Sequence, residues 1–386
     1  MDPIPAISLS PHERTWVEIN QTALLSNLAQ IVTVARGTQI GIVLKGNAYG
    51  HGLTLVAQTL EAQPSVDVLL VAGVSEALIL RIAGCRKPIV VLSYYDGPVI
   101  EAIRQQITLS VASIAMLHNV IIAAQQAQVP AMIHLEVETG LQRTGLDGAS
   151  LATVMQLLER HPINVQLRGI YTHLCDTNNP DQRFTQEQLE QFTTMAEQLD
   201  PHHHCSWHVA ASGGLYVPHL FDGVRVGTML YGSWKSKVQQ QRMLEHYPTI
   251  SLQPALSWKT RIIAIHTVPT GSSLGYDRTV IATKPLRIAV LPVGYSDGYQ
   301  RALSNRGVVR IHEQYAPIVG IMSMNLMTVD ITDITNVEIG DIAILVGPHQ
   351  RITPAALAEQ LNSNPNVITG SINPLIPRLV VREDAV

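Results

Sequence analysis

Eight short apolar runs between residues 15 and 230 constrain the fold of this chain more than any other feature of its sequence. Longer segments with the apolar spacing of helices, such as LTLVAQTLEA at 53–62, separate these runs. Strands that alternate with helices build a parallel sheet, and eight such units close into a (β/α)8 barrel. The predicted strands are GIVLK (41–45), DVLLVAG (67–73), PIVVLSY (88–94), ITLSV (107–111), AMIHLEV (131–137), QLRGIYTH (166–173), CSWHV (205–209) and GVRVG (223–227).

Beyond residue 250 the pattern changes to short β-branched runs broken by Gly, Pro and Asp, such as GVVRI at 307–311. This pattern predicts a mostly antiparallel β domain. The polar interval at 233–253 lacks strand patterning, and 386 residues suffice for two domains. We therefore predict an α/β chain in which residues 12–245 form the barrel domain and residues 246–386 form the β domain. Residues 1–11 are expected to associate with the β domain.

Charge and hydropathy narrow the class of partner. The formal net charge is -4 and the pI is near 6.4, and no Lys/Arg-rich run is present that would bind nucleic acid or an anionic membrane. No stretch reaches the roughly 18 apolar residues of a membrane span, and the N-terminus lacks the pattern of a signal peptide. We therefore expect a cytoplasmic protein that acts on a small molecule.

The cysteines and a histidine-rich segment do not predict a metal site. Cys85, Cys175 and Cys205 are odd in number and differ in context, which argues against a disulfide framework and fits a reducing compartment. The histidines at 202–204, with Cys205 and His208, have the density of metal ligands. However, neighbours on an extended segment point to alternating faces, and no second ligand pair follows. We expect no bound metal.

Lys45 has the most informative position in the chain. It ends the first predicted strand and precedes the loop GNAYGHG at 46–52. The carboxyl end of a barrel strand faces the mouth, where the active sites of barrel enzymes lie. Desolvation there lowers the pKa of a lysine and makes its amine a nucleophile.

The segment KGNAYGHG at 45–52 resembles the KANAYGHG cofactor motif of the alanine racemase family, with Gly46 in place of Ala. Further segments resemble that family in the same order along nearly the whole chain. They are ETGLQRTG (138–145), GIYTH (169–173), HVAAS (208–212), VRVGTMLYG (224–232), GYDRT (275–279), PVGYSDGYQR (292–301), GIMSMN (320–325) and INPLIPR (372–378).

This resemblance implies an amino-acid racemase that uses pyridoxal 5'-phosphate (PLP) and interconverts L-alanine and D-alanine. Lys45 would carry the cofactor and act as one base, and Tyr276 would act as the second base. Racemisation needs proton removal on one face and delivery on the other, while the cofactor withdraws electrons from the substrate. In the family this tyrosine comes from the partner subunit, so the resemblance also implies a homodimer with shared active sites.

The resemblance assigns further residues to the cofactor and the substrate. Arg225 would face the pyridine nitrogen, and a guanidinium can only donate a hydrogen bond to it. His173 would lie against the ring and, with Arg225, assist Tyr276. The phosphate would bind Tyr49, Ser212 and the backbone N–H groups of Gly227 and Thr228, and the substrate would meet Arg143, Tyr295 and Met324.

Some positions depart from the family pattern. Glu136 stands where relatives often have a carbamylated lysine, and we hypothesise that it supplies the negative charge beside Arg143 directly. Asn366 stands where a phosphate-binding tyrosine is usual. Ala211 and Asn325 replace common residues near the substrate, so serine or a larger amino acid stays open as the substrate.

Three alternatives to an alanine racemase remain. A barrel decarboxylase with the same cofactor shares the early lysine and the β domain but has no role for Tyr276. A non-catalytic PLP carrier leaves the β domain without a purpose. A degenerate homologue that binds PLP without turnover is the third.

Overall fold

All eight predicted barrel strands form in the structure, a computed structural model that describes residues 13–382. They pair in parallel in chain order, and β9 closes the barrel onto β2, with Gln39 opposite Gly223. The predicted fold class is thereby confirmed. The strands are β2 (Gln39–Val43), β3 (Val68–Gly73), β4 (Ile89–Tyr94), β5 (Thr108–Val111), β6 (Ala131–Glu136), β7 (Val165–Tyr171), β8 (Ser206–Ala211) and β9 (Gly223–Val226).

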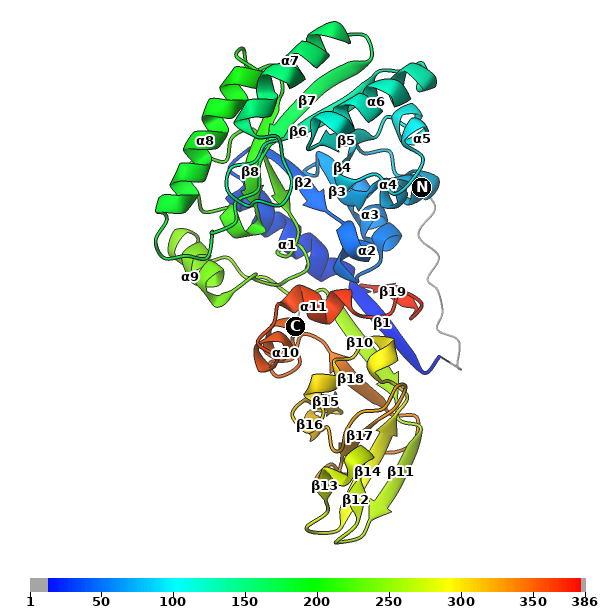
Figure 1. Cartoon of the computed structure of the whole chain (residues 1–386). Coiled ribbons are helices and arrows are strands. Elements are labelled where there is room, and N and C mark those ends of the chain that lie inside the picture. The colour runs from blue at the N-terminus through cyan, green and yellow to red at the C-terminus, as the bar shows by residue number, and fades with distance from the viewer. Residues whose placement is uncertain (1–12, 383–386) are drawn as a thin grey trace.

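Helices surround the barrel and shield its outer face (Figure 1). Their apolar stripes face the strands, as in α7, where Leu151, Val154 and Leu157 are buried. No helix in the described part of the chain is both long and apolar enough to cross a membrane. The helices are α1 (Gln21–Val34), α2 (Lys45–Tyr49), α3 (Leu53–Glu61), α4 (Val74–Ile82), α5 (Val99–Arg104), α6 (Ile114–Ala127), α7 (Leu151–Arg160), α8 (Arg183–Leu199) and α9 (Lys237–His246).

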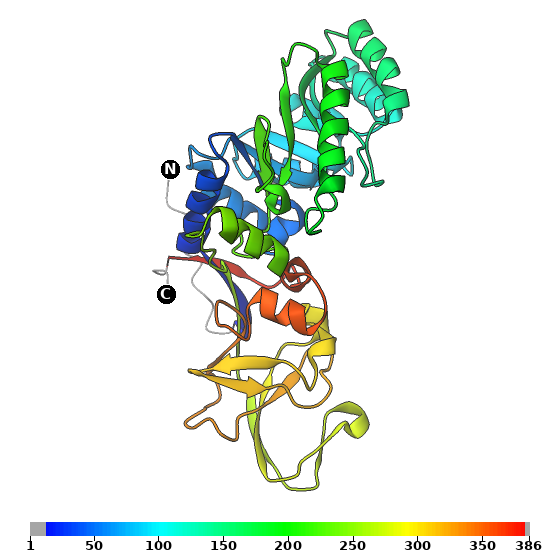
Figure 2. The same ribbon diagram turned by 90° about the vertical axis from the view of Figure 1, so that its left-hand side faces the viewer.

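The second part of the chain forms a β domain below the barrel, so that the molecule is elongated (Figures 1 and 2). Its sheets have the orders β16-β15-β18-β10-β1-β19, β11-β14-β17 and β12-β13. The elements are β1 (Thr15–Asn20), β10 (Leu256–Arg261), β11 (Ala264–Val268), β12 (Ser273–Leu274), β13 (Val280–Ile281), β14 (Leu286–Leu291), β15 (Val308–Ile311), β16 (Gln314–Pro317), β17 (Met327–Asp330), β18 (Ile342–Val346), α10 (Pro354–Gln360), α11 (Pro365–Gly370) and β19 (Arg378–Val381).

Strand β1 differs from the prediction, which placed residues 12–245 in the barrel domain. It lies in the six-stranded sheet of the β domain, antiparallel to β10 and parallel to β19. Trp16 and Trp258 are both buried, and Trp258 Nε1 donates to Thr15 Oγ1 at 2.8 Å across a separation of 243 residues. Local periodicity cannot reveal such a pairing. The expectation for residues 1–11 lies outside the described residues.

The seam between the two parts supports the loop that follows Lys45. Gly50 has φ +85°, and a Cβ there would lie 2.0 Å from the Thr369 carbonyl oxygen, so only glycine allows this approach. The buried Arg378 side chain donates through Nε to Gly50 O at 3.1 Å. Its other nitrogens donate to the carbonyls of Ile372, Asn373 and Ile376.

Replacing Arg378 with Met should therefore destabilise the chain, because buried carbonyl groups lose their donors. We expect the free energy of unfolding to fall by about 3 kcal/mol or more. Urea unfolding measures it, with Arg382→Met as the control, because that exposed side chain bonds Gln21 at the surface. Equal effects of the two substitutions would show that the seam does not depend on Arg378.

Candidate active site

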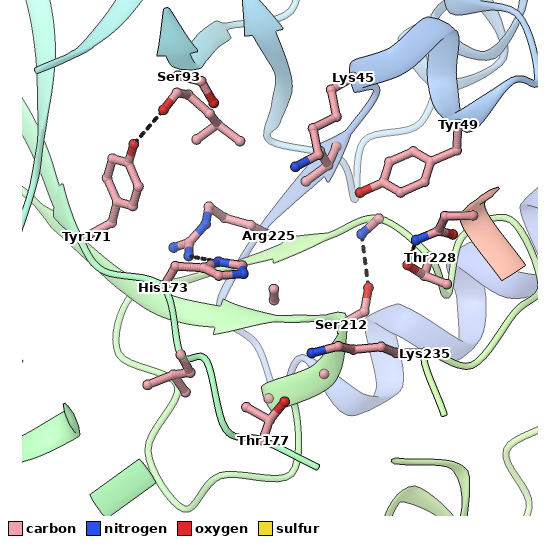
Figure 3. A pocket seen from close by; sticks show the side chains of 18 of the residues that line it. Lys45, Tyr49, Ser93, Tyr171, His173, Thr177, Ser212, Arg225, Thr228 and Lys235 are labelled. Atoms are coloured by element: carbon pink, nitrogen blue, oxygen red, sulfur yellow. Dashed lines mark hydrogen bonds between the residues drawn. The ribbon is translucent and has the colours of Figure 1, made fainter. Parts of the chain in front are cut away.

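A cavity opens at the carboxyl ends of the barrel strands (Figure 3). Parallel closure brings the ends of β2, β4, β6, β7, β8 and β9 to one mouth, so residues far apart in sequence meet there. The structure brings together nine of the predicted site residues, whose roles stay predictions. They are Lys45, Tyr49, Glu136, Arg143, His173, Ser212, Arg225, Gly227 and Thr228.

The loop after Lys45 is a turn of left-handed helix. Residues 46–49 have φ between +53° and +64°, a conformation that costs about 1–2 kcal/mol for each residue other than glycine. Side chains hold the turn in place: Glu76 Oε1 accepts from Asn47 N at 3.2 Å, and Asn47 Oδ1 accepts from Leu53 N at 2.8 Å. The turn directs Lys45 and Tyr49 into the same cavity (Figure 3).

The Lys45 amine lies in the open mouth of the cavity. Enclosure by protein atoms lowers the pKa of Lys45 below its usual value, and the positive charges of Arg143 and Arg225 lower it further. Glu76 opposes this effect. The lowered pKa increases the fraction of the neutral amine, which is the form that attacks a carbonyl carbon.

Arg225 on β9 is a buried cation inside the barrel, 4% exposed. Its guanidinium donates to Thr172 O at 2.7 Å, His208 O at 2.8 Å and Val209 O at 3.2 Å, and also approaches His173 Nδ1 at 3.5 Å. Desolvation lowers the pKa of Arg225 to about 10, so it stays charged at neutral pH. These contacts tie β7, β8 and β9 together beneath the cavity.

Two further histidines, His208 and His134, continue this network, and neither was predicted to belong to the site. Arg225 Nη1 lies 2.7 Å from His208 Nδ1, and His208 Nε2 lies 3.0 Å from His134 Nδ1. Because a guanidinium only donates, His208 Nδ1 must accept, and its Nε2–H must donate to His134. Desolvation and Arg225 lower the pKa of both histidines, which fits neutral rings. The sequence feature that could have indicated them is their position on two predicted barrel strands, β6 and β8.

The phosphate side of the predicted site contains hydroxyl groups and backbone amides. Ser212 Oγ accepts from Gly227 N at 3.0 Å. A Cβ at Gly227 would lie 2.4 Å from Tyr49 Oη, so a larger residue would displace that hydroxyl. Burial raises the pKa of Tyr49 to about 12, which keeps it a donor. Asn366 Nδ2 donates to Thr228 Oγ1 at 3.1 Å.

Glu136 and Arg143 both line the cavity, but no ion pair within 4.0 Å joins them among residues 13–382. Glu136 is 4% exposed, and its Oε2 accepts from Thr144 Oγ1 at 2.9 Å. Burial raises the pKa of Glu136, whereas Thr144 and the nearby arginines lower it. Burial is the largest of these effects, so the net pKa of Glu136 is raised, and its carboxyl group shares the cavity with Arg143 and Arg225.

Tyr276, Tyr295 and Met324 do not line this cavity. They lie on the β domain and are 63%, 42% and 55% exposed. Their loops pack together: the amide after Tyr295 donates to Met324 O at 3.0 Å, and a Cβ on Gly320 would lie 3.1 Å from Gly275 Cα. Strands β12 and β13, which flank Tyr276, lie at the end of the molecule that is remote from the barrel (Figure 1). The structure therefore separates these three residues from Lys45 within one chain.

The histidine-rich segment has other partners. His203 Nε2 pairs with Asp222 Oδ2 at 2.7 Å, and Cys205 Sγ bonds Asp200 Oδ2 at 3.1 Å. Among the described residues, no group of three or more His, Cys, Asp or Glu side chains could hold a metal ion.

The barrel mouth thus holds a lysine of lowered pKa, a buried arginine, and a cluster of hydroxyls and backbone amides. These features, on a barrel followed by a β domain, place the chain in the class of two-domain barrel enzymes. Residues 19–234 match the alanine racemase N-terminal domain, and residues 255–380 match the alanine racemase C-terminal domain. The chain belongs to the alanine racemase family.

Individual relatives agree over almost the full length. The chain is 32% identical over 377 residues to alanine racemase 2 of Caldanaerobacter subterraneus subsp. tengcongensis, which covers 95% of each chain. The structure matches alanine racemase of Clostridium difficile 630 with a TM-score of 0.89 at 28% identity, covering 97% of each chain. It also matches the fold of the Bartonella henselae alanine racemase with covalently bound pyridoxal phosphate, with a TM-score of 0.82 at 24% identity over 95% and 99% of the two chains.

The neutral buried histidines predict acid lability. Desolvation lowers the pKa of His51 and His134 to about 4 and that of His208 well below its usual value. Below the unfolded pKa of about 6.5 the unfolded chain therefore binds more protons than the folded chain. The free energy of unfolding should fall as the pH drops from about 6.5 to 4, by up to roughly 1.4 kcal/mol per pH unit for each histidine.

Urea unfolding at several pH values tests this. The slope of the free energy of unfolding against pH gives the number of protons taken up on unfolding, and His134→Gln should lower that number by about one. A stability that stays constant between pH 6.5 and 4 would contradict the neutral network.

Proposed function

We propose that this protein is a PLP-dependent alanine racemase that interconverts L-alanine and D-alanine with Lys45 and Tyr276 as its two bases. The observation that carries the proposal is the cavity, where the activated Lys45 amine lies with Arg225 and a hydroxyl-and-amide cluster. Family membership over both domains supports the same reaction. The three free cysteines support a cytoplasmic location.

The residues of the cavity fit PLP. Tyr49, Ser212, Gly227 and Thr228 would hold the phosphate, and Arg225 would donate to the pyridine nitrogen. Two observations support the fit: Gly227 allows Tyr49 to approach closely, and the buried Thr177 Oγ1 has no hydrogen-bond partner among the described residues. When bound, PLP withdraws electrons from the bond between the substrate Cα and its hydrogen.

The chain's own residues then move the proton. The Lys45 Nζ accepts or returns it on one face of the substrate Cα, and the Tyr276 hydroxyl does so on the other. Arg225 would keep its own proton and, because a guanidinium can only donate, would leave the pyridine nitrogen unprotonated. His173 stays neutral, because desolvation and Arg225 lower its pKa to about 3, and would lie against the ring.

A second copy of the chain would supply Tyr276. In a single chain Lys45 and Arg143 are exposed at the barrel mouth, while Tyr276, Tyr295 and Met324 form an exposed apolar group on the β domain. A head-to-tail dimer covers both surfaces at once and closes two identical sites. Tyr295 and Met324 would then line the substrate side together with Arg143.

Turnover in deuterated water tests the two-base assignment. The wild-type protein should bring deuterium to Cα of both alanine enantiomers, whereas a decarboxylase would release an amine. Lys45→Ala should abolish the visible absorption band of the bound cofactor. Tyr276→Phe should keep this band and lose turnover from one enantiomer by about 100-fold or more. Faster turnover of serine than of alanine would reassign the substrate, and PLP binding without exchange would indicate a degenerate homologue.

Mixing the two variants tests the shared site. After dissociation and random reassociation, half of the dimers are mixed, and each mixed dimer contains one intact site. A mixture of Lys45→Ala and Tyr276→Phe chains should thus recover about a quarter of the wild-type activity. Failure to recover activity, with mixed dimers shown by mass spectrometry, would contradict a Tyr276 donated in trans.

Glu136 should replace the carbamylated lysine of relatives. Activity of the wild-type protein should not change with added bicarbonate, and Glu136→Gln should raise the KM for alanine by about 10-fold, because Arg143 loses its neighbouring charge. Glu136→Lys should become bicarbonate-dependent. Strong stimulation of the wild type by bicarbonate, or an undamaged Glu136→Gln enzyme, would contradict this role.

A further inference from the structure

Lys235 lines the cavity on its phosphate side, although no family motif pointed to it. It lies in the loop between β9 and α9, and Figure 3 shows its side chain between Ser212 and Thr177. A Cβ built on Gly213 would lie 3.9 Å from Lys235 Nζ and 2.9 Å from Thr177 Oγ1. An ammonium and a hydroxyl therefore flank the backbone position that follows Ser212.

Within the described part of the chain, the Lys235 ammonium has no carboxylate partner and the Thr177 hydroxyl has no hydrogen-bond partner. Among residues 13–382, no carboxylate lies within 4.0 Å of Lys235 Nζ. Thr177 is 3% exposed, and its Oγ1 makes no hydrogen bond within the described part of the chain. A buried hydroxyl without a partner costs free energy unless a ligand satisfies it. Together, the ammonium and the hydroxyl indicate a place for an anion.

The fold holds Lys235 beside the phosphate side of the cavity. The buried Gln239 accepts from Lys235 N at 2.6 Å through Oε1, and its Nε2 donates to Ser212 O. One side chain thus joins the loop of Lys235 to the backbone of Ser212, whose hydroxyl bonds Gly227 N. The rest of this side supplies neutral donors, which leaves a phosphate dianion without a cation.

We propose that Lys235, with the Thr177 hydroxyl, binds the cofactor phosphate at a site where Asn366 takes the place of the usual tyrosine. This inference rests on the proposed PLP-dependent function. Asn366 lines the same cavity, but its Nδ2 already donates to Thr228 Oγ1 at 3.1 Å, and its amide carries no charge. A phosphate monoester carries a charge of about −1.5 to −2 at neutral pH, and an ammonium forms a charge-assisted bond with it.

Comparing PLP with pyridoxal, which lacks the phosphate, tests this proposal on the full-length apoprotein. Lys235→Gln should weaken PLP binding by roughly 10- to 100-fold and change pyridoxal binding by less than about twofold. Lys235→Arg should restore most of the PLP affinity, and Thr177→Val should weaken PLP selectively by about 5-fold. Absorbance titration measures all four variants, including the control Lys237→Gln, which removes an exposed lysine paired with Glu359.

The outcomes separate this inference from the proposed function. If wild-type protein binds PLP and Lys235→Gln keeps the wild-type ratio of PLP to pyridoxal affinity, Lys235 does not bind the phosphate. An equal loss for both ligands would likewise overturn the proposal, because it would indicate a structural role. If wild-type protein binds no PLP, the proposed function fails as well. Inorganic phosphate should compete with PLP in the wild type more strongly than in Lys235→Gln.

Discussion

The buried charge of Arg225 is the interaction on which the rest of the site depends. A cation inside a barrel is tolerated only when acceptors surround it, and here carbonyls from β8 and from the end of β7 supply them. The same charge requires His208 to accept at Nδ1, which in turn fixes its bond to His134. Arg225, His208 and His134 thus form one connected network inside the barrel. Val43, Leu70 and Val90 form a separate apolar cluster there, with Tyr49 packed against it.

The strained turn after Lys45 shows why the β domain matters to a site built on the barrel. Three residues other than glycine have left-handed dihedrals there. Such a strained turn persists only where contacts with the surrounding structure hold it in place. Glu76 supports it from the barrel, while Thr369 and Arg378 support it from the C-terminal segments. The position of the Lys45 amine therefore depends on both parts of the chain.

Local patterns predicted the barrel well because most of its strands are short, largely buried runs, of which β5 and β9 are buried throughout. The resemblance then predicted nine residues that share the cavity. What escaped prediction depends on long-range geometry. Three contacts join segments whose spacing carries no periodic signal. They are the pairing of β1 with β10, the hydrogen bond between His208 and His134, and the approach of Lys235 to Gly213.

The exposed groups of the single chain follow from the same geometry. The barrel mouth is open at the carboxyl ends of the parallel strands, and among the described residues Tyr276, Tyr295 and Met324 on the β-domain loops stay exposed. In the dimer proposed above, a twofold axis would bring the β-domain loops of each chain to the barrel mouth of the other. A reaction that needs a base on each face of one carbon would then gain those bases from two rigid bodies, and neither body would have to deform to place them.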